Sequence, residues 1–535
     1  MRVFGAGLLI SAAAAVTAVT APVAASPPDR PAFIAPDADH SAQLQADVNA
    51  RQPDGSTALQ WAVYNDDLPQ VQKLLAAGAD VAATNDYGAT ALSLAAEQGN
   101  AGIIHALLKG GANANAANAE GQTALMVVAR TGNIEAAQML LKAGANVNAT
   151  EHWGGQTALM WAASQHQPQM LRLLLKHGAK PDTLSVVHNW ERKVTAEPRE
   201  KSMDRGGFAA LHYAAREGCV ACIAVLVKGG ADINILDGQG TTPLVIALMN
   251  LRFDTARVLI ETGADIQLWD FYGQTPLYAA VDTNTVPKGA RPDVASTDTA
   301  TGLDLINLLI ARGANVNAQL KLRMPGRAMP GDRNADFRVL NIGATPLTRA
   351  AVAADIPAMQ ALIKAGALVD LPVADGITPF YATVLPATGR ARFKTEEQAL
   401  EAMRVLKAAG ADPNKAVTAS SRVLHLIHVH TPDHARVPGT TPLMMAAVRG
   451  WKDAARQLVA YGMDINAKDS DGLTALDYAM GRERFGFLQV KPSPNPEMAA
   501  LLRELGANAE TLNLPPWPPL SVPQIRPLVP ELLYF

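Results

Sequence analysis

The 33 residues from Thr90 to Gln122, TALSLAAEQGNAGIIHALLKGGANANAANAEGQ, decide how this chain folds. A leucine and a pair of alanines recur at helical spacing after the threonine, which predicts a short helix with one apolar face. A Leu-Leu pair followed by glycine predicts a second helix that ends at a left-handed residue, Gly111. Neither helix can bury its apolar face alone, so units of this kind must stack on one another.

The same pattern recurs along most of the chain. Thr57, Thr90 and Thr123 are 33 residues apart, and three further threonine pairs have the same spacing, namely Thr242 and Thr275, Thr345 and Thr378, and Thr441 and Thr474. Eleven units result, each a helix, a tight turn, a second helix and an extended connection rich in Asp and Asn. We therefore predict an all-α repeat solenoid.

The two recurring phrases, GxTPLxxA and LLxxGADVNAxDxxG, resemble the ankyrin repeat family over about residues 47 to 507. The resemblance implies a curved solenoid of antiparallel helix pairs with β-hairpin-like fingers along one edge. It also implies that function is protein recognition on a concave face made of the fingers and the first helices.

The sequence departs from the family pattern at two kinds of position. The family's histidine after the first-helix leucine is retained only as His212, and the first-helix threonine is Ala209 in the fifth unit. We therefore expect the hydrogen-bond ladder between repeats to be lost where other residues replace the histidine, namely Gln60, Ser93, Met126, Met160, Val245, Tyr278, Thr348, Tyr381, Met444 and Asp477.

Departures from the regular spacing locate insertions and set the predicted boundaries. Three long insertions, 183–206, 318–342 and 415–438, fall in finger connections, where insertions often contribute to binding. The predicted organisation is a signal peptide at 1–25, a linker at 26–46, repeats 1–4 at 47–182, repeats 5–7 at 207–317, repeats 8–9 at 343–414, repeats 10–11 at 439–507 and a Pro-rich tail at 508–535. We expect the tail either to lie along the array as a cap or to bind a partner.

The N-terminus and the composition bear on the compartment. Arg2 is followed by an uncharged run to Ala25, which is typical of a secretory signal peptide; an uncleaved membrane anchor is the alternative. We expect a periplasmic or secreted protein of bacterial type that does not contact the membrane after cleavage. The net charge of −3 offers no bulk attraction to nucleic acid.

Four of the chain's 11 histidines, His425, His428, His430 and His434, lie close together in the third long finger. Zinc or copper could bind such ligands, which would favour a metal-binding accessory protein or an enzyme. A finger that packs its apolar residues on the solenoid is the favoured alternative, because only Asp433 lies beside them as a further ligand and no HExxH motif occurs.

The two cysteines, Cys219 and Cys222, lie at the start of a predicted second helix. Residues three apart on a helix are within reach of a disulfide. We expect either a local structural disulfide or two unreactive thiols, because no thioredoxin-like strand precedes the pair.

The sequence thus predicts a non-catalytic scaffold without a cofactor, which we expect to be a monomer that binds another envelope protein. The resemblance places ligand-contacting positions beside the finger glycines. These positions include Tyr87, Glu120, Trp153, Phe271, Tyr272 and Asp471, of which four are aromatic in a chain with only 5% aromatic residues. Exposed aromatic residues commonly anchor an interface; packing against neighbouring fingers is the alternative.

Overall fold

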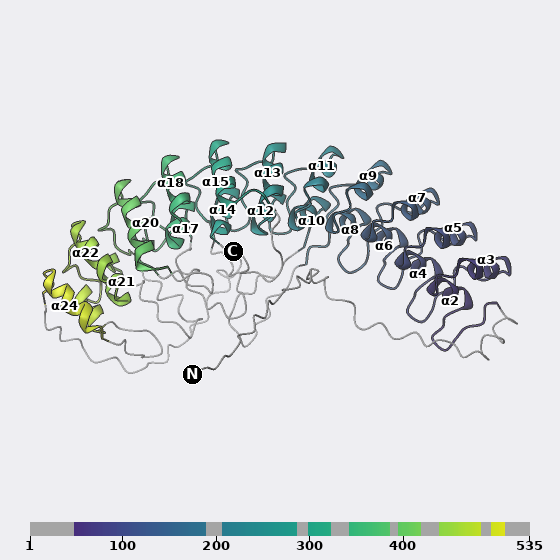
Figure 1. Ribbon diagram of the computed structural model, residues 1–535, viewed down its shortest axis with the longest axis horizontal. Helices are drawn as coiled ribbons and strands as arrows, with labels where there is room; N and C mark the ends of the chain where they lie inside the picture. The colour runs from purple at the N-terminus through teal and green to yellow at the C-terminus, as the bar shows by residue number, and fades with distance from the viewer. Residues whose placement is uncertain are drawn as a thin grey trace, which may run out of the picture.

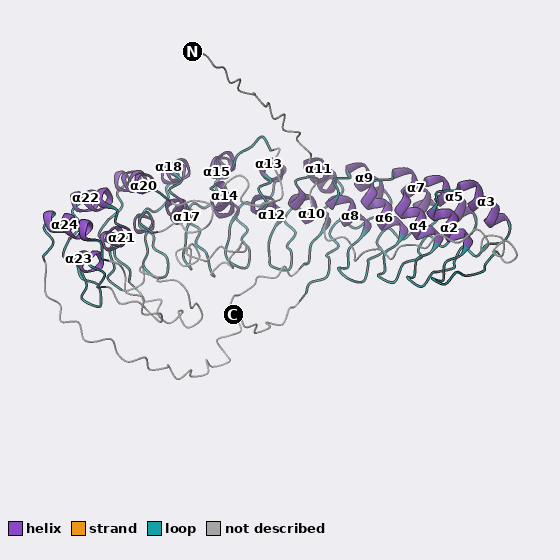
Figure 2. Ribbon diagram, turned by 60° about the horizontal axis from the view of Figure 1, so that its bottom comes forward, coloured by secondary structure: helices purple, strands orange, loops and turns teal. Residues whose placement is uncertain are grey.

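The computed structural model describes residues 48–188, 206–285, 298–322, 342–385, 394–418, 438–482 and 494–508. These ranges contain eleven helix pairs arranged in an arch, with the first helix of each pair on the inner side and the second on the outer side (Figure 1). The connections project along one edge of the array (Figure 2). The predicted repeat solenoid is confirmed.

The inner row consists of the first helix of each pair. Its members are α2 (Ala58–Tyr64), α4 (Ala91–Gln98), α6 (Ala124–Thr131), α8 (Ala158–Ser164), α10 (Ala210–Glu217), α12 (Pro243–Met249), α14 (Pro276–Asn284), α17 (Pro346–Ala353), α19 (Pro379–Ala382), α21 (Pro442–Arg449) and α23 (Ala475–Ala479).

The outer row consists of the second helix of each pair. Its members are α3 (Leu68–Ala76), α5 (Ala101–Lys109), α7 (Ile134–Lys142), α9 (Pro168–Lys176), α11 (Val220–Lys228), α13 (Phe253–Thr262), α15 (Gly302–Ala311), α18 (Ile356–Lys364), α20 (Glu396–Ala408), α22 (Lys452–Ala460) and α24 (Pro496–Glu504).

The repeated threonine begins each unit because it caps the inner helix. In α4 the Thr90 hydroxyl accepts a hydrogen bond from the backbone N–H of Ser93 at 3.1 Å, which satisfies a donor that has no partner within the helix. Gly111, with φ of +95°, ends the second helix of the same unit. No atom lies within 4 Å of the Cβ that another residue would add there, so the backbone conformation and not the space requires glycine.

The alanine pairs and the leucines form the core. Ala95 and Ala96 are fully buried, and so are Ile104 and Leu107 of the second helix in the same unit. The small alanine side chains let the two helices approach closely. Buried residues from Leu59 to Ala507 belong to one continuous apolar cluster, so each repeat is stabilised by its neighbours and not by a core of its own.

The hydrogen-bond ladder between repeats is present at two inner helices. The His212 Nδ1 atom accepts from the backbone N–H of Ala209 at 3.1 Å, and Nε2 lies 3.1 Å from the carbonyl oxygen of Thr241 in the next unit. Gln60 makes the same two contacts: its Oε1 accepts from Thr57 N at 2.8 Å, and its Nε2 donates to Ala89 O at 2.7 Å.

The expectation that Gln60 breaks the ladder is therefore wrong. An amide carries an acceptor and a donor about as far from the backbone as the two imidazole nitrogens are, and so reproduces the histidine's pattern. Met126, Met160, Val245 and Met444 cannot donate the ladder hydrogen bond to the next repeat, because their side chains carry no N–H or O–H group.

Candidate interface at fingers 3 and 4

Fingers 2, 3 and 4 are loops, each closed by a single bridge between backbones. Finger 2 is closed between Thr84 and Thr90, finger 3 between Ala117 and Thr123, and finger 4 between Thr150 and Thr157. We name these fingers by the residues from bridge to bridge: 84–90, 117–123 and 150–157. Finger 4 is one residue longer than the other two, and this extra residue shapes the site.

Finger 3 shows how a regular loop is held. The Asn118 Oδ1 atom accepts from the backbone N–H groups of Glu120 at 3.0 Å and Gln122 at 2.9 Å. Asn85 in finger 2 makes the equivalent bonds to Tyr87 and Ala89. One short side chain thus satisfies two loop donors.

Finger 4 has Glu151 where finger 3 has Asn118, and the longer side chain spans the longer loop. Its carboxylate accepts from Trp153 N at 2.6 Å, from Gly154 N at 2.9 Å and from Gln156 N at 2.8 Å. Glu151 is buried, 7% exposed, while Trp153 at the turn is 84% exposed. A buried carboxylate therefore fixes the backbone that presents an exposed indole.

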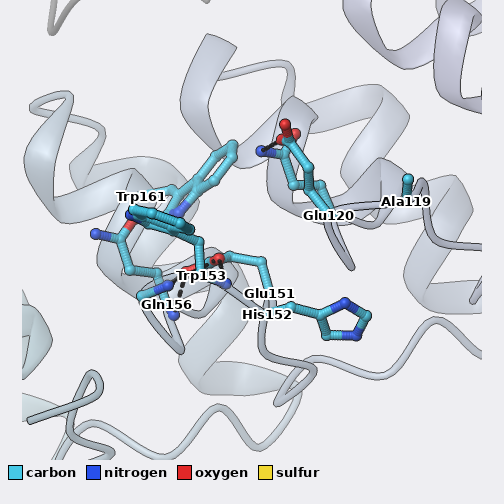
Figure 3. Close-up of a pocket in the computed structure, with 9 residues that line it drawn as sticks. Ala119, Glu120, Glu151, His152, Trp153, Gln156 and Trp161 are labelled. Carbon is cyan, nitrogen blue, oxygen red and sulfur yellow. Dashed lines mark hydrogen bonds between the residues drawn. The ribbon is translucent and has the colours of Figure 1, made fainter. Parts of the chain in front are cut away.

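Fingers 3 and 4 are joined through their backbones and line an open cavity of about 520 Å³. His152 N donates to Glu120 O at 2.9 Å, and the His152 ring lies so close to Gly121 that a Cβ there would meet it at 2.6 Å. In Figure 3 the His152 ring and the Trp153 indole point to opposite sides of the finger. The cavity is lined by Ala119, Glu120, Gln122, Glu151, His152, Trp153, Gly154, Gln156 and Trp161.

The inner helix α8 contributes Trp161 to this cavity. The Arg130 guanidinium, at the end of α6, lies 5.4 Å from the centroid of the Trp161 ring, which is a cation–π contact. The Trp161 Nε1 atom is buried and has no hydrogen-bond partner. Trp161 therefore presents ring carbons to the cavity and not its N–H donor.

Polar contacts continue from the cavity toward the next repeat. The Gln156 Nε2 atom donates to the Tyr213 hydroxyl on α10 at 2.8 Å. Tyr213 packs edge-on against Phe208, with ring centroids 5.5 Å apart, and the Arg216 guanidinium lies 5.2 Å from the Tyr213 ring. The wall of the cavity is thus supported by aromatic packing in the fifth unit.

The predicted site residues separate into groups along the arch. Glu120 and Trp153 line the cavity, whereas Tyr87, which is 55% exposed, lies on finger 2 and is not part of the lining. On the seventh finger the Phe271 and Tyr272 rings pack edge-on with centroids 5.4 Å apart. The six residues therefore do not form one patch.

Asp471 lies on the eleventh finger, beside a buried carboxylate. Its backbone N–H donates to the Asp469 Oδ1 atom at 2.9 Å, and the Tyr478 hydroxyl donates to Asp469 Oδ2 at 2.7 Å. Burial raises the pKa of Asp469, and hydrogen bonds from Leu473 and Tyr478 partly oppose this. Burial, followed by the charge of Asp469, raises the pKa of the Tyr478 hydroxyl far above its usual range.

Sequence reasoning missed two exposed or cavity-lining tryptophans. Trp161 occupies the fourth position after the capping threonine, where Trp61 and Tyr213 also occur, so a recurring aromatic residue at one inner-helix position was the available signal. Trp269, which is 55% exposed, lies in the stretch WDFYG of the seventh finger, where three aromatic residues occur within four.

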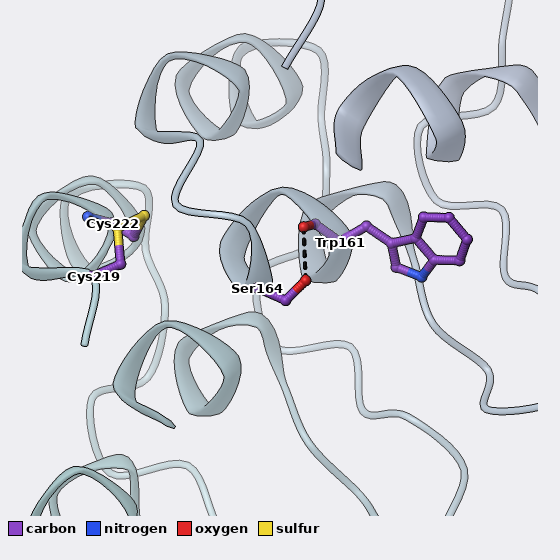
Figure 4. The surroundings of a disulfide bond; sticks show 4 residues. All are labelled: Trp161, Ser164, Cys219 and Cys222. Atoms are coloured by element: carbon purple, nitrogen blue, oxygen red, sulfur yellow. Dashed lines mark hydrogen bonds between the residues drawn. A yellow bond between two sulfur atoms is a disulfide. The ribbon is translucent and has the colours of Figure 1, made fainter. Parts of the chain in front are cut away.

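The two cysteines are joined at the start of α11 (Figure 4). The Sγ atoms are 1.99 Å apart, and the Cα atoms 5.2 Å. Cys219 is the residue that caps α11, and its Sγ accepts from Cys222 N at 3.2 Å, as the side chains of Asn100 and Asn133 do in α5 and α7. Both cysteines are buried.

Several predictions fall outside the described residues. These are the signal peptide at 1–25 and linker at 26–46, most of each long finger insertion including His425, His428, His430 and His434, and all but the first residue of the tail at 508–535. Within the described ranges, no group of three His, Cys, Asp or Glu residues could hold a metal ion. None of the helices described here has the length and apolar character needed to cross a bilayer.

Comparison with known proteins agrees with the architecture. A family described as "Ankyrin repeats (3 copies)" matches residues 38–118, 92–185, 211–320 and 400–510, and the chain belongs to this ankyrin repeat family. Its repeat architecture is that of a protein-interaction scaffold.

Two individual proteins are similar to parts of this chain. Mouse protein phosphatase 1 regulatory subunit 27 is 47% identical over 62 residues, which are 11% of this chain and 40% of that protein, less than half of its length. The crystal structure of the ankyrin repeat domain of Bcl-3, a member of the IkappaB family, aligns over 42% of this chain and 94% of that chain with 25% identity and a TM-score of 0.36.

Proposed function

We propose that this chain is a non-catalytic scaffold that binds a protein partner along its concave face and finger edge, with the cavity of fingers 3 and 4 as the principal contact. The observation that carries the proposal is Trp153, an indole that is 84% exposed while the loop beneath it is held by a buried carboxylate. A preorganised aromatic residue at the mouth of a cavity has the features of an interface anchor.

We further propose that the scaffold acts in the periplasm or outside the cell. The uncharged N-terminal run to Ala25 supports export. The bond between Cys219 and Cys222 supports an oxidising compartment, since cytosolic thiols are normally kept reduced.

Photocrosslinking tests the proposed interface. A photoreactive phenylalanine analogue replaces Trp153 in one variant, and in a control variant it replaces Gln138, an exposed residue of the outer helix α7. In an extract of the source organism's envelope, we expect a protein that crosslinks at position 153 and not at position 138. Equal crosslinking at the two positions would contradict the proposal.

Substitution tests the same contact quantitatively. We expect Trp153→Ala to weaken binding of the crosslinked partner by about 2 kcal/mol or more. The melting temperature should hardly change, because so exposed a side chain contributes little buried area to the fold. Lowered melting with unchanged binding would show that the indole is structural.

A further inference from the structure

We propose that the cavity of fingers 3 and 4 accepts an arginine side chain from an extended, basic segment of the partner. This inference rests on the proposed function and specifies the chemistry of the bound segment. It draws on the charge of the neighbouring fingers, on the unused hydrogen-bond acceptor positions of the Glu120 carboxylate and on the two indoles of the cavity.

Charge on the first four fingers, of which finger 1 is the loop closed between Arg51 and Thr57, is strongly one-sided. Their loops carry the carboxylates of Asp54, Asp86, Glu120 and Glu151, whereas Arg51 is their one guanidinium. The Arg51 side chain is directed to the neighbouring finger, where Nη1 donates to Thr84 O at 3.0 Å. The four inner helices behind these fingers add one acid and one base. Such a surface attracts a cationic segment.

Glu120 is the carboxylate at this cavity that is able to take a new partner. It is exposed, accepts one hydrogen bond from Gln122 Nε2 at 2.9 Å, and forms no ion pair with any described residue. Glu151, by contrast, is buried and already accepts three backbone N–H groups. Because a carboxylate has about four acceptor positions, Glu120 retains sites for a bidentate donor.

The indoles favour a guanidinium over an ammonium group. The Arg130 guanidinium already lies 5.4 Å from the centroid of the Trp161 ring, so the chain itself pairs a guanidinium with an indole at the wall of the cavity. Trp153 offers a second indole, which is 84% exposed and has no stacking partner among the described residues. A planar guanidinium can stack on an indole while its N–H groups bind a carboxylate in pairs, which a lysine ammonium cannot do.

Selection from a random-peptide library displayed on phage, with the full chain as the immobilised target, tests this inference. We expect the enriched peptides to share an arginine. Replacement of that arginine by citrulline, which is neutral and of the same shape, should weaken binding at least about tenfold in a fluorescence polarisation assay, and replacement by lysine should weaken it less.

Variants of the chain locate the binding site. Binding of the enriched peptide should fall at least about tenfold in Glu120→Gln and in Trp153→Ala. The matched control is Glu135→Gln, which removes an exposed carboxylate from the outer helix α7 and should leave binding unchanged. Because Glu120 and Trp153 are exposed, circular dichroism should show all three variants folded like the parent.

The possible failures are distinguishable. Enriched peptides that are acidic or uncharged, but still lose binding in Trp153→Ala, would overturn the arginine assignment and leave the proposed interface standing. Peptides that bind both cavity variants as well as the parent would overturn the interface as well. A library without any enriched peptide would overturn the inference.

Discussion

Glu151 is expected to be matched in length to the six-residue loop that it holds. In Glu151→Asp the side chain loses one methylene group and keeps its charge. From the shorter side chain, the carboxylate should still reach Trp153 N, two residues along, but not Gln156 N, five residues along. In finger 3 the shorter Asn118 side chain reaches only as far as Gln122, four residues along.

The expected cost follows from the bonds that are lost. A hydrogen bond to a charged acceptor contributes about 1.5 to 3 kcal/mol, and the donors of finger 4 are partly buried, so water replaces only part of each bond. We expect the free energy of local opening of finger 4 to fall by about 2 kcal/mol in Glu151→Asp, which corresponds to roughly 30-fold faster amide exchange.

A second variant restores the match between side chain and loop. Deletion of Gly154 together with Glu151→Asp leaves Asp-His-Trp-Gly-Gln-Thr, which has the pattern of Asp-Phe-Tyr-Gly-Gln-Thr at residues 270–275. In that finger Asp270 Oδ1 accepts from Tyr272 N and Gln274 N, each at 2.9 Å. We therefore expect the double variant to recover most of the lost protection.

Hydrogen exchange of the full chain, measured by mass spectrometry, is the suitable assay, because stacked repeats need not unfold in one step. Amides of finger 4 report the effect, and those of finger 2 serve as the internal control. The reasoning would be refuted if Glu151→Asp exchanged like the parent, or if the double variant exchanged as fast as the single one.

Three further predictions concern the fold. His212→Ala should lower the free energy of local opening of its unit by about 2 kcal/mol, whereas His212→Gln should nearly match the parent, because Gln60 makes the same two contacts. Equal losses of protection in hydrogen exchange would disprove the equivalence. The pKa of Asp469 is raised in the folded state, so its charge lowers stability above that pKa and has no effect below the unfolded value of 3.8. Asp469→Asn should therefore be more stable than the parent at neutral pH, and this difference in stability should shrink on acidification. A difference that grows on acidification would contradict the reasoning. Reduction of the Cys219–Cys222 disulfide should lower the stability of the parent by about 2 kcal/mol, whereas reductant should not affect a Cys222→Ser variant. Full alkylation of the parent without reductant would show that the disulfide is absent.

The repeat architecture could be predicted from sequence because its signals are local. A capping threonine, a leucine, two alanines and a terminal glycine each act within one or two turns of helix, and they recur at a constant spacing. The hydrogen-bond ladder was harder to predict, because Gln60 is a different residue type from the family's histidine and yet its amide makes the same two hydrogen bonds.

The candidate site could be predicted only in part. Glu120 and Trp153 were predicted as contact residues, and the spacing of 34 between Thr123 and Thr157 reveals the extra residue of finger 4. The sequence alone determined the repeat, its caps and the fingers that carry these residues. The tertiary structure decided that Trp161 joins them in one cavity, because that depends on how neighbouring repeats stack and on the backbone bond from His152 to Glu120. Contacts between residues on different repeats depend on how the repeats pack, and no local pattern in the sequence predicts that packing.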